Sequence, residues 1–345
     1  MLKEKITNLI LNNRVAGKAA IVALNTKNYG GQKYMEECER RKKLELWDYQ
    51  ELSAEMQPHY ADLSPNSSYY GIMHQIKKYV GMEGFCYWNV EHGLFLGEYV
   101  ESESFGRAMK GTITFSDKRR EYLEKRIKSK VVTIGPYIHY AEAYYTEEKF
   151  REVKAKMGRI LLAFPPHSTR TSQATYDTEM FIKKLREMGK EYDTVMVCMF
   201  FKDIQSGAYK PYEDEGFKIV TSGHMFDSNF LSRQKEIIRL SDFTVSASVG
   251  THIGYCLYLG KEHMILSLSE DGGIGGNINE RIDVRKEGVD APNIKFDSYH
   301  TDEELLLKLF LDHGKKESAK QREVVSSLWG FDCVKQADEL RRLLQ

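Results

Sequence analysis

One stretch of the chain combines small polar residues with glycine in a pattern suited to holding phosphate. Residues 243–246 form a short apolar run of strand length, and a segment of helical character follows and ends at Gly260. The turn between them contains Ser246, Ser248, Gly250 and Thr251. Such a turn presents unpaired backbone N–H groups and the positive end of a helix dipole, and both attract phosphate. The same residues also fit an ordinary strand-to-helix junction with a serine or threonine cap.

Histidines follow three apolar runs of strand length in the second half of the chain. With their hydroxyl neighbours they are His167, Ser168, Thr169, His224 and His252. Ligands of open α/β sheets bind at the carboxyl ends of strands, so we expect these side chains at one sheet edge, where an imidazolium would offset phosphate charge. A metal site is the alternative, but the chain lacks His-x-His and His-Glu-x-x-His patterns. We therefore predict no metal and no other cofactor.

The second half of the chain alternates strand-like and helical segments. Apolar runs of strand length occupy residues 160–164, 194–201, 217–221, 243–246, 264–268 and 293–296. Helical patterns cover residues 176–188, 229–240 and 302–313, the last of which begins with the capping box Thr301-x-x-Glu304. This alternation predicts a parallel sheet that is covered by helices on both faces.

The first half is less regular. It has expected strands at residues 19–24, 85–90, 112–115 and 131–136, and expected helices at residues 67–81, 117–130 and 145–157. A polar glycine loop over residues 25–31 would follow the first strand. We expect an α/β first domain over residues 1–157, a Rossmann-like second domain over residues 158–320, and a C-terminal helix over residues 321–345 that packs back on the first domain.

Composition limits the classes of function. The 345 residues carry 50 basic and 50 acidic side chains, so no overall positive charge favours nucleic acid. No apolar stretch approaches the roughly 20 residues of a membrane span, and the charged N-terminus lacks a signal-peptide core. The five cysteines are dispersed, which favours a reducing cytoplasm without disulfides or structural zinc.

The order of these elements, with the phosphate-type turn late in the chain, resembles the plan of GT-B glycosyltransferases, two Rossmann-like domains with a cleft between them. Several short motifs also resemble those of bacterial capsule and surface-polysaccharide glycosyltransferases. They are Tyr70-Gly71, Ile76-Lys-Lys-Tyr-Val-Gly81, Glu91-His92-Gly93, Phe164-Pro-Pro-His-Ser-Thr169, Gly223-His224 and Val249-Gly-Thr-His-Ile-Gly254. The resemblance implies sugar transfer from a nucleotide-sugar donor, held by the second domain, to a growing capsule or lipopolysaccharide glycan. The chain shows no extended Glu-x7-Glu signature of the kind found in many retaining transferases. It also shows no Asp-x-Asp at a plausible strand end, which disfavours the metal-dependent GT-A class.

An inverting transfer needs a base for the acceptor hydroxyl and donors for the departing phosphate. His92 is one candidate base, with Glu91 orienting it, and Glu91 is another. Asp117 is a third, although an acidic residue in the first turn of a helix needs no further role. On the donor side we expect contacts from His167, Ser168, Thr169, His224, Ser246, Ser248, Gly250, Thr251 and His252.

The acceptor would be a glycan or a lipid-linked glycan. The basic residues of segment 117–130 form either a solvated face or a dock for anionic lipid at the inner face of the membrane. Two other functions remain open at this point. A nucleotide-sugar 2-epimerase uses the same two-domain plan without an acceptor cleft, and a sugar- or nucleotide-binding module would lack catalysis.

Overall fold

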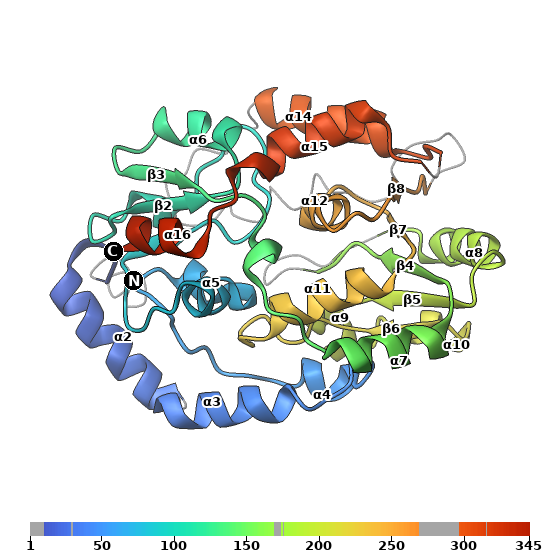
Figure 1. The fold of residues 1–345 in the computed structure, drawn as a ribbon, viewed down its shortest axis with the longest axis horizontal. Helices are drawn as coiled ribbons and strands as arrows, with labels where there is room; N and C mark the ends of the chain where they lie inside the picture. Colours follow the sequence, from blue (N-terminus) through green and yellow to red (C-terminus); the bar gives the residue numbers. More distant parts are fainter. Residues whose placement is uncertain (1–9, 29, 169–173, 175, 269–296, 315) are drawn as a thin grey trace.

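The computed structural model of the protein describes residues 10–28, 30–168, 174, 176–268, 297–314 and 316–345. Its strands form two parallel sheets, one from each half of the chain, with helices packed around both (Figure 1). The predicted α/β class with parallel sheets is therefore confirmed. None of the helices within the described ranges combines the length and the apolar character needed to cross a bilayer.

The first sheet has the order β1-β2-β3, with β1 at Trp88–Val90, β2 at Gly111–Thr114 and β3 at Lys130–Thr133. Before it come the 3-10 helix η1 (Pro65–Gly71) and α5 (Ile72–Val80), and α6 (Asp117–Glu124) joins β2 to β3. The predicted strands and helices of this region are present, but α6 is shorter than the expected segment 117–130.

The second sheet has five parallel strands in the order β6-β5-β4-β7-β8. Their bounds are Ile160–Phe164 for β4, Thr194–Cys198 for β5, Lys218–Val220 for β6, Phe243–Ser246 for β7 and His263–Ile265 for β8. From β4 the chain first adds strands on one side and then, at β7, on the other. The neighbouring strands β4 and β7 therefore form a topological switch point, where such sheets bind their ligands.

Side-chain alternation along β4 explains how both faces of this sheet are covered. Leu161 and Ala163 pack with α8 (Thr178–Gly189) on one face. Ile160 and Leu162 belong to the core of the other face, which α7, α11 and α12 complete. Those helices span Glu147–Met157, Phe230–Leu240 and Thr251–Tyr258.

The shorter helices are η2 (Ser102–Phe105), η3 (Tyr137–Tyr140), α9 (Phe201–Gln205), α10 (Lys210–Asp214) and η4 (Phe331–Cys333).

The N-terminal region forms a helical arm, and the strand expected at residues 19–24 is wrong. That segment lies inside α2 (Arg14–Asn28), and the expected glycine loop 25–31 is the end of α2 and the start of α3 (Gly30–Arg41). Only Gly17 and Ile21 of α2 are buried, one turn apart, which is the spacing of a helix face. The apolar run suggested a buried strand, but its alanines and valine lie partly on the exposed side of the helix.

The arm continues to the second sheet through α4 (Tyr49–Ser53). The backbone N–H of Thr221 donates to Leu46 O at 3.2 Å, and that of His224 donates to Leu52 O at 2.9 Å. An N-terminal segment therefore extends the β6 edge, although it precedes the first sheet in the sequence (Figure 1).

The C-terminal region returns to the first sheet. It contains α14 (Asp297–Phe310), α15 (Ala319–Trp329) and α16 (Ala337–Leu344). Helix α16 packs on α5, and Trp88 of β1 donates its indole N–H to Leu344 O at 3.1 Å. The strand expected at residues 293–296 lies outside the described residues.

Candidate functional site

A cleft of about 360 Å³ lies between the loop that follows β1 and the carboxyl edge of the second sheet. Phe164 and Pro165 line it at the end of β4, and residues 248–252 line it after β7, so it occupies the switch point. Across from them lie Tyr70 and residues 92–96 of the first half. Its described lining contains no Asp, Glu, Lys or Arg. A larger hollow of about 700 Å³ lies at the amino ends of β5 and β6, away from these strand ends.

The turn after β7 places the start of a helix at the cleft. Gly250 and Thr251 begin α12 at the cleft wall, so the positive end of this helix faces the cleft. Thr251 Oγ1 accepts a hydrogen bond from the backbone N–H of Leu94 at 2.9 Å, which joins the two halves. A Cβ on Gly250 would lie 2.8 Å from the ring of His252, so only glycine leaves this ring in place.

Ser248 lines the cleft, whereas Ser246 lies beneath it. The Ser246 hydroxyl donates to Ser248 O at 2.9 Å and lies 3.0 Å from His263 Nε2. Ser246 is fully buried, so it supports the shape of the turn and is not available to a ligand.

His252 and His167 both line the second-sheet wall of the cleft. The His252 ring stacks on Phe164 with centroids 4.8 Å apart, and the exposed His167 ring lies 4.8 Å from that of Phe200. The backbone N–H of Ser168 donates to the Asp203 carboxylate at 3.1 Å. Thr169 lies outside the described residues.

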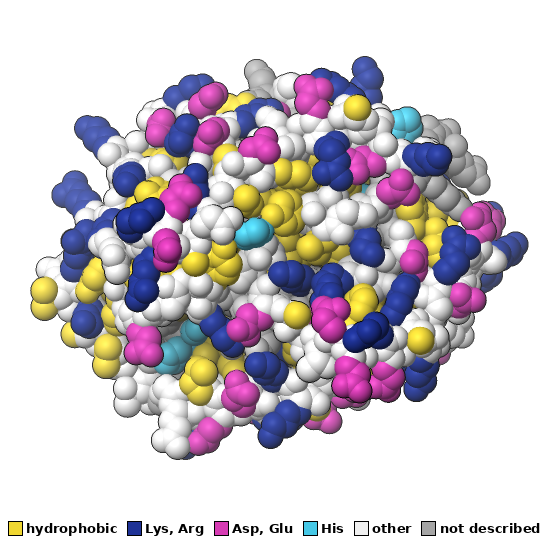
Figure 2. All heavy atoms as spheres, in the orientation of Figure 1, with side chains coloured by type: hydrophobic (Ala, Val, Ile, Leu, Met, Phe, Trp, Pro, Cys, Tyr) yellow, Lys and Arg dark blue, Asp and Glu magenta, His cyan; other side chains and the backbone are white. Residues whose placement is uncertain are grey.

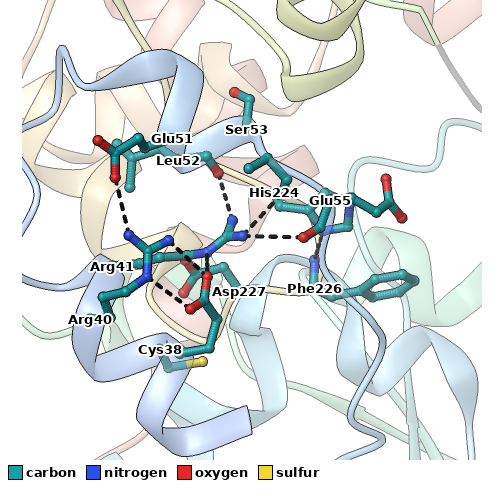
Figure 3. A network of polar contacts seen from close by, with 12 residues as sticks. Cys38, Arg40, Arg41, Glu51, Leu52, Ser53, Glu55, His224, Phe226 and Asp227 are labelled. Atoms are coloured by element: carbon teal, nitrogen blue, oxygen red, sulfur yellow. Dashed lines mark hydrogen bonds and ion pairs between the residues drawn. The ribbon is translucent and has the colours of Figure 1, made fainter. Parts of the chain in front are cut away.

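His224 does not line the cleft. It is buried under Phe201, whose ring centroid is 4.2 Å away, and its Nδ1 accepts from the backbone N–H of Phe226 at 3.3 Å. Burial, assisted by the nearby charge of Arg41, lowers the pKa of His224 to about 4. Figure 3 shows Arg41 reaching the end of α4 beside His224. A neutral, enclosed imidazole offers no charge to a phosphate, so His224 belongs to the junction between the arm and β6.

His92 lines the cleft from the first half, at the end of β1. Its Nδ1 lies 3.4 Å from Oε2 of the buried Glu101, and the rings of Tyr69 and Phe95 meet it edge-on. Burial alone would lower the pKa of His92, but the Glu101 carboxylate outweighs it, and the pKa is raised. Asn66 Nδ2 donates to the same Glu101 oxygen at 2.8 Å. The arrangement places a fixed carboxylate in ion-pair contact with a cleft histidine, which suits a general base.

Glu91 and Asp117 lie elsewhere. The Glu91 carboxylate is buried on Arg119, with Nε 3.0 Å from Oε2, and it also accepts from Thr114 Oγ1 at 2.7 Å. Asp117 is exposed at the start of α6, where it accepts from Thr133 Oγ1 at 2.8 Å. Neither carboxylate lines the cleft.

Tyr70 and Phe164 were named from the sequence only as parts of motifs, and Glu101, Gln234 and the other cleft aromatics were not singled out. The aromatic side chains are Tyr70, Phe95, Phe164, Phe200, Phe230 and Tyr255. Tyr70 could have been recognised from the sequence as a turn residue, because it directly precedes a glycine. Tyr70 has a left-handed φ of 59° and donates its N–H to Met225 O at 2.7 Å, so the turn joins the two halves. Glu101 gave no signal, because its partners Asn66 and His92 lie in other segments.

No protein-family model matches the chain, and no curated protein sequence matches it. Among solved structures, a wall teichoic acid polymerase, TagF, aligns with a TM-score of 0.38 and 14% identity over 76% of this chain and 66% of its own. The pneumococcal O-GlcNAc transferase GtfA, solved with UDP and GlcNAc, aligns with a TM-score of 0.32 and 11% identity over 78% of this chain. The chain spans just under two thirds of the first structure and 49% of the second. These TM-scores do not establish a shared fold, so neither similarity assigns an activity.

Proposed function

We propose that this protein is a glycosyltransferase of the two-domain GT-B plan. It would move a sugar from a nucleotide-sugar donor to a growing surface glycan of the capsule or lipopolysaccharide kind, by an inverting and metal-independent reaction. One observation carries the proposal: the cleft at the β4/β7 switch point is faced, from the other half, by a histidine whose Nδ1 lies 3.4 Å from a buried carboxylate. The unpaired cysteines favour the reducing cytoplasm as its compartment.

On the donor side, the second sheet would hold the nucleotide diphosphate. The start of α12 supplies backbone N–H groups at Gly250 and Thr251, and the Ser248 hydroxyl and the His252 ring stand beside them. Phosphate favours such a helix start because the helix dipole and the free N–H groups act together. His167 would contact the donor at the rim of the cleft.

On the acceptor side, His92 would act as the base. Its Nδ1 faces Glu101, so Nε2 is the atom that takes the proton of the acceptor hydroxyl. The acceptor oxygen forms a bond to the anomeric carbon as the bond from that carbon to the diphosphate breaks. The departing nucleoside diphosphate keeps the electron pair of the broken bond, and the start of α12 stabilises its negative charge.

Ligand-induced thermal stabilisation tests the donor site. UDP, CMP, GDP and CDP would be compared on the whole chain, because a ligand that binds the folded state raises the melting temperature. Gly250→Val should abolish this rise in melting temperature, because the valine side chain would displace the His252 ring. The variant should still fold, because the extended backbone at Gly250 tolerates valine. The matched control is Gly314→Val, at a glycine whose Cβ direction is open. A folded Gly250→Val protein with the shift of the unmodified chain would refute the donor assignment.

Turnover tests the base. His92→Ala should lower turnover of the nucleotide sugar identified by that screen by about 10²–10⁴-fold, the usual effect of losing a general base. Nucleotide affinity should barely change, because His92 lies across the cleft from the donor turn. Near-normal turnover in a folded His92→Ala protein would remove His92 from the mechanism. Transfer to an acceptor would separate this function from that of an epimerase or a binding module.

A further inference from the structure

The basic segment 117–130, which the sequence offered as a lipid dock, uses several of its cations within the fold. Arg119 is buried on Glu91, Lys118 pairs with the buried Asp302, and Arg120 lies 3.3 Å from Asp117. Ion pairs of this kind leave less positive charge for a distant surface. A face that combines exposed apolar side chains with cations lies instead on α2. Arg14 Nε donates to Ala108 O at 2.7 Å, and no ion pair of Arg14 or Lys18 occurs among the described residues.

The outward face of α2 exposes large apolar side chains to water. Val15 is 83% exposed and Val22 is 50% exposed, and both belong to a group of four large hydrophobic residues that stand out among the described residues. With the exposed Ala19 they follow a spacing of four and three residues, so they share one side of the helix. Gly17 and Ile21 are buried on the other side.

This face is also positively charged. Helix α2 contains Arg14, Lys18 and Lys27 and no acidic residue, in a chain whose formal charge is zero. Arg14 and Lys18 border a hollow of about 690 Å³ whose other lining residues are Val15, Ala19, Val22, Ala23 and Tyr87. Figure 2 shows hydrophobic atoms beside Lys and Arg atoms over α2, at the left edge of the molecule. The exposed Met35 of α3 has the acidic Glu36 and Glu37 beside it and lacks this combination.

We infer that the outward face of α2, defined by Arg14, Val15, Lys18, Ala19 and Val22, binds the surface of an anionic lipid bilayer. The valines would enter the boundary between headgroups and acyl chains, while the cations contact the headgroups. The charge favours this occupant, because a symmetric contact with a second copy of the chain would bring the same cations against α2. The inference concerns a different face from the nucleotide cleft, so it stands or falls apart from the proposed function.

Co-sedimentation of the whole chain with vesicles tests the inference. Vesicles of phosphatidylcholine with phosphatidylglycerol should bind the protein, and vesicles of phosphatidylcholine alone should bind it more weakly. Lys18→Glu should weaken binding to the anionic vesicles by about fivefold or more, since one basic residue near such a surface contributes about that factor. Val15→Asp should weaken it as well, and its position in the first turn of α2 suits an acidic residue, so the helix is retained.

Two matched controls locate the effect. Lys125→Glu makes the same charge change on the 117–130 segment, and Met35→Asp makes the same apolar-to-acidic change on α3; neither should alter vesicle binding. All four variants should keep the melting temperature and the nucleotide-induced shift of the unmodified chain. Equal binding to both vesicle types, no binding, or an equal loss from Lys125→Glu would overturn the inference. So would a dimer in solution that Val15→Asp dissociates, because α2 would then be an interface between copies.

Discussion

Glu91 and His92 are adjacent in the sequence but have opposite surroundings. Successive side chains at the end of a strand point to opposite sides, so only one of the pair can face the cleft. The structure gives that place to His92 and puts the Glu91 carboxylate on Arg119. The motif alone predicted a candidate base at this point of the chain. It did not predict which residue, because the choice depends on Arg119 and Glu101.

The first prediction concerns the acidic limb of the pH–rate profile. Glu101 raises the pKa of His92, so Glu101→Gln should lower that pKa while the amide keeps the acceptor for Asn66. A general base works in its neutral form, and a lower pKa keeps it neutral at lower pH. The limb of kcat against pH should therefore move to lower pH, by about one unit.

Glu91→Gln is the matched control for this prediction. It leaves the buried Arg119 without its counter-charge, which costs about 3–5 kcal/mol of stability, and it removes a charge that raises the pKa of His92 less than Glu101 does. Unfolding in denaturant should show that loss, while the acidic limb should move to lower pH by less than it does in Glu101→Gln. If Glu101→Gln left the limb in place, Glu101 would have only a structural role.

The second prediction concerns divalent ions. The described cleft lining contains no carboxylate that would bind magnesium or manganese. Turnover should therefore be the same with excess chelator as with added magnesium. Loss of turnover in chelator that manganese or magnesium restores would contradict the metal-independent reaction.

At the scale of single elements, helix α12 depends on α15 for its position. A Cβ on Gly254 of α12 would lie 2.2 Å from the indole of Trp329, and that indole donates its N–H to Thr251 O at 3.2 Å. The helix whose start faces the cleft is therefore fixed by a tryptophan near the end of α15.

The third prediction follows from this contact. Gly254→Ala should push Trp329 away and cost about 1–3 kcal/mol of stability, as overpacking does. It should also weaken nucleotide binding, because the α12 start moves with its helix. Denaturant unfolding and the nucleotide-induced shift measure the two effects, and Gly314→Ala serves as the open-space control. An unchanged free energy of unfolding would show that α15 does not hold α12.

The sequence predicted well those elements whose residue pattern is complete within one short segment. Strands β4 and β7 have the expected bounds, and α11 differs from its expected range by one residue, because each is a continuous apolar pattern with clear ends. The arm was not predicted in the same way. Its segment around Leu46 and Leu52 pairs with residues near Thr221 and His224, and such distant partners leave no local pattern.

At the scale of the whole molecule, the two halves exchange segments. The α4 region of the arm bonds to the segment that follows β6 of the second sheet, and α16 packs on α5 beside the first sheet. One hydrophobic core contains Trp88 and Ile113 of the first sheet together with Ile160 and Leu162 of the second. The arm thus packs across the expected boundary at residue 157, whereas α16 lies on the first half, the side on which the C-terminal helix was expected.

The fourth prediction concerns an isolated second half. A fragment of residues 158–320 lacks the arm at the β6 edge and the Trp329 contact beneath α12, so it should unfold without a cooperative transition. The full chain should unfold cooperatively, with tryptophan fluorescence and far-ultraviolet circular dichroism changing together. A fragment that unfolds as sharply as the full chain would show that these exchanged segments are dispensable.

The bond from Trp88 to Leu344 also has a consequence for synthesis, because the two residues are 256 positions apart. A ribosome delivers β1 long before α16, so the first sheet stays uncovered on that side while the whole second half is made. Many proteins finish their N-terminal part first as the chain emerges. Here the part that is made first is among the last to be completed, and until then it presents the surface that chaperones recognise.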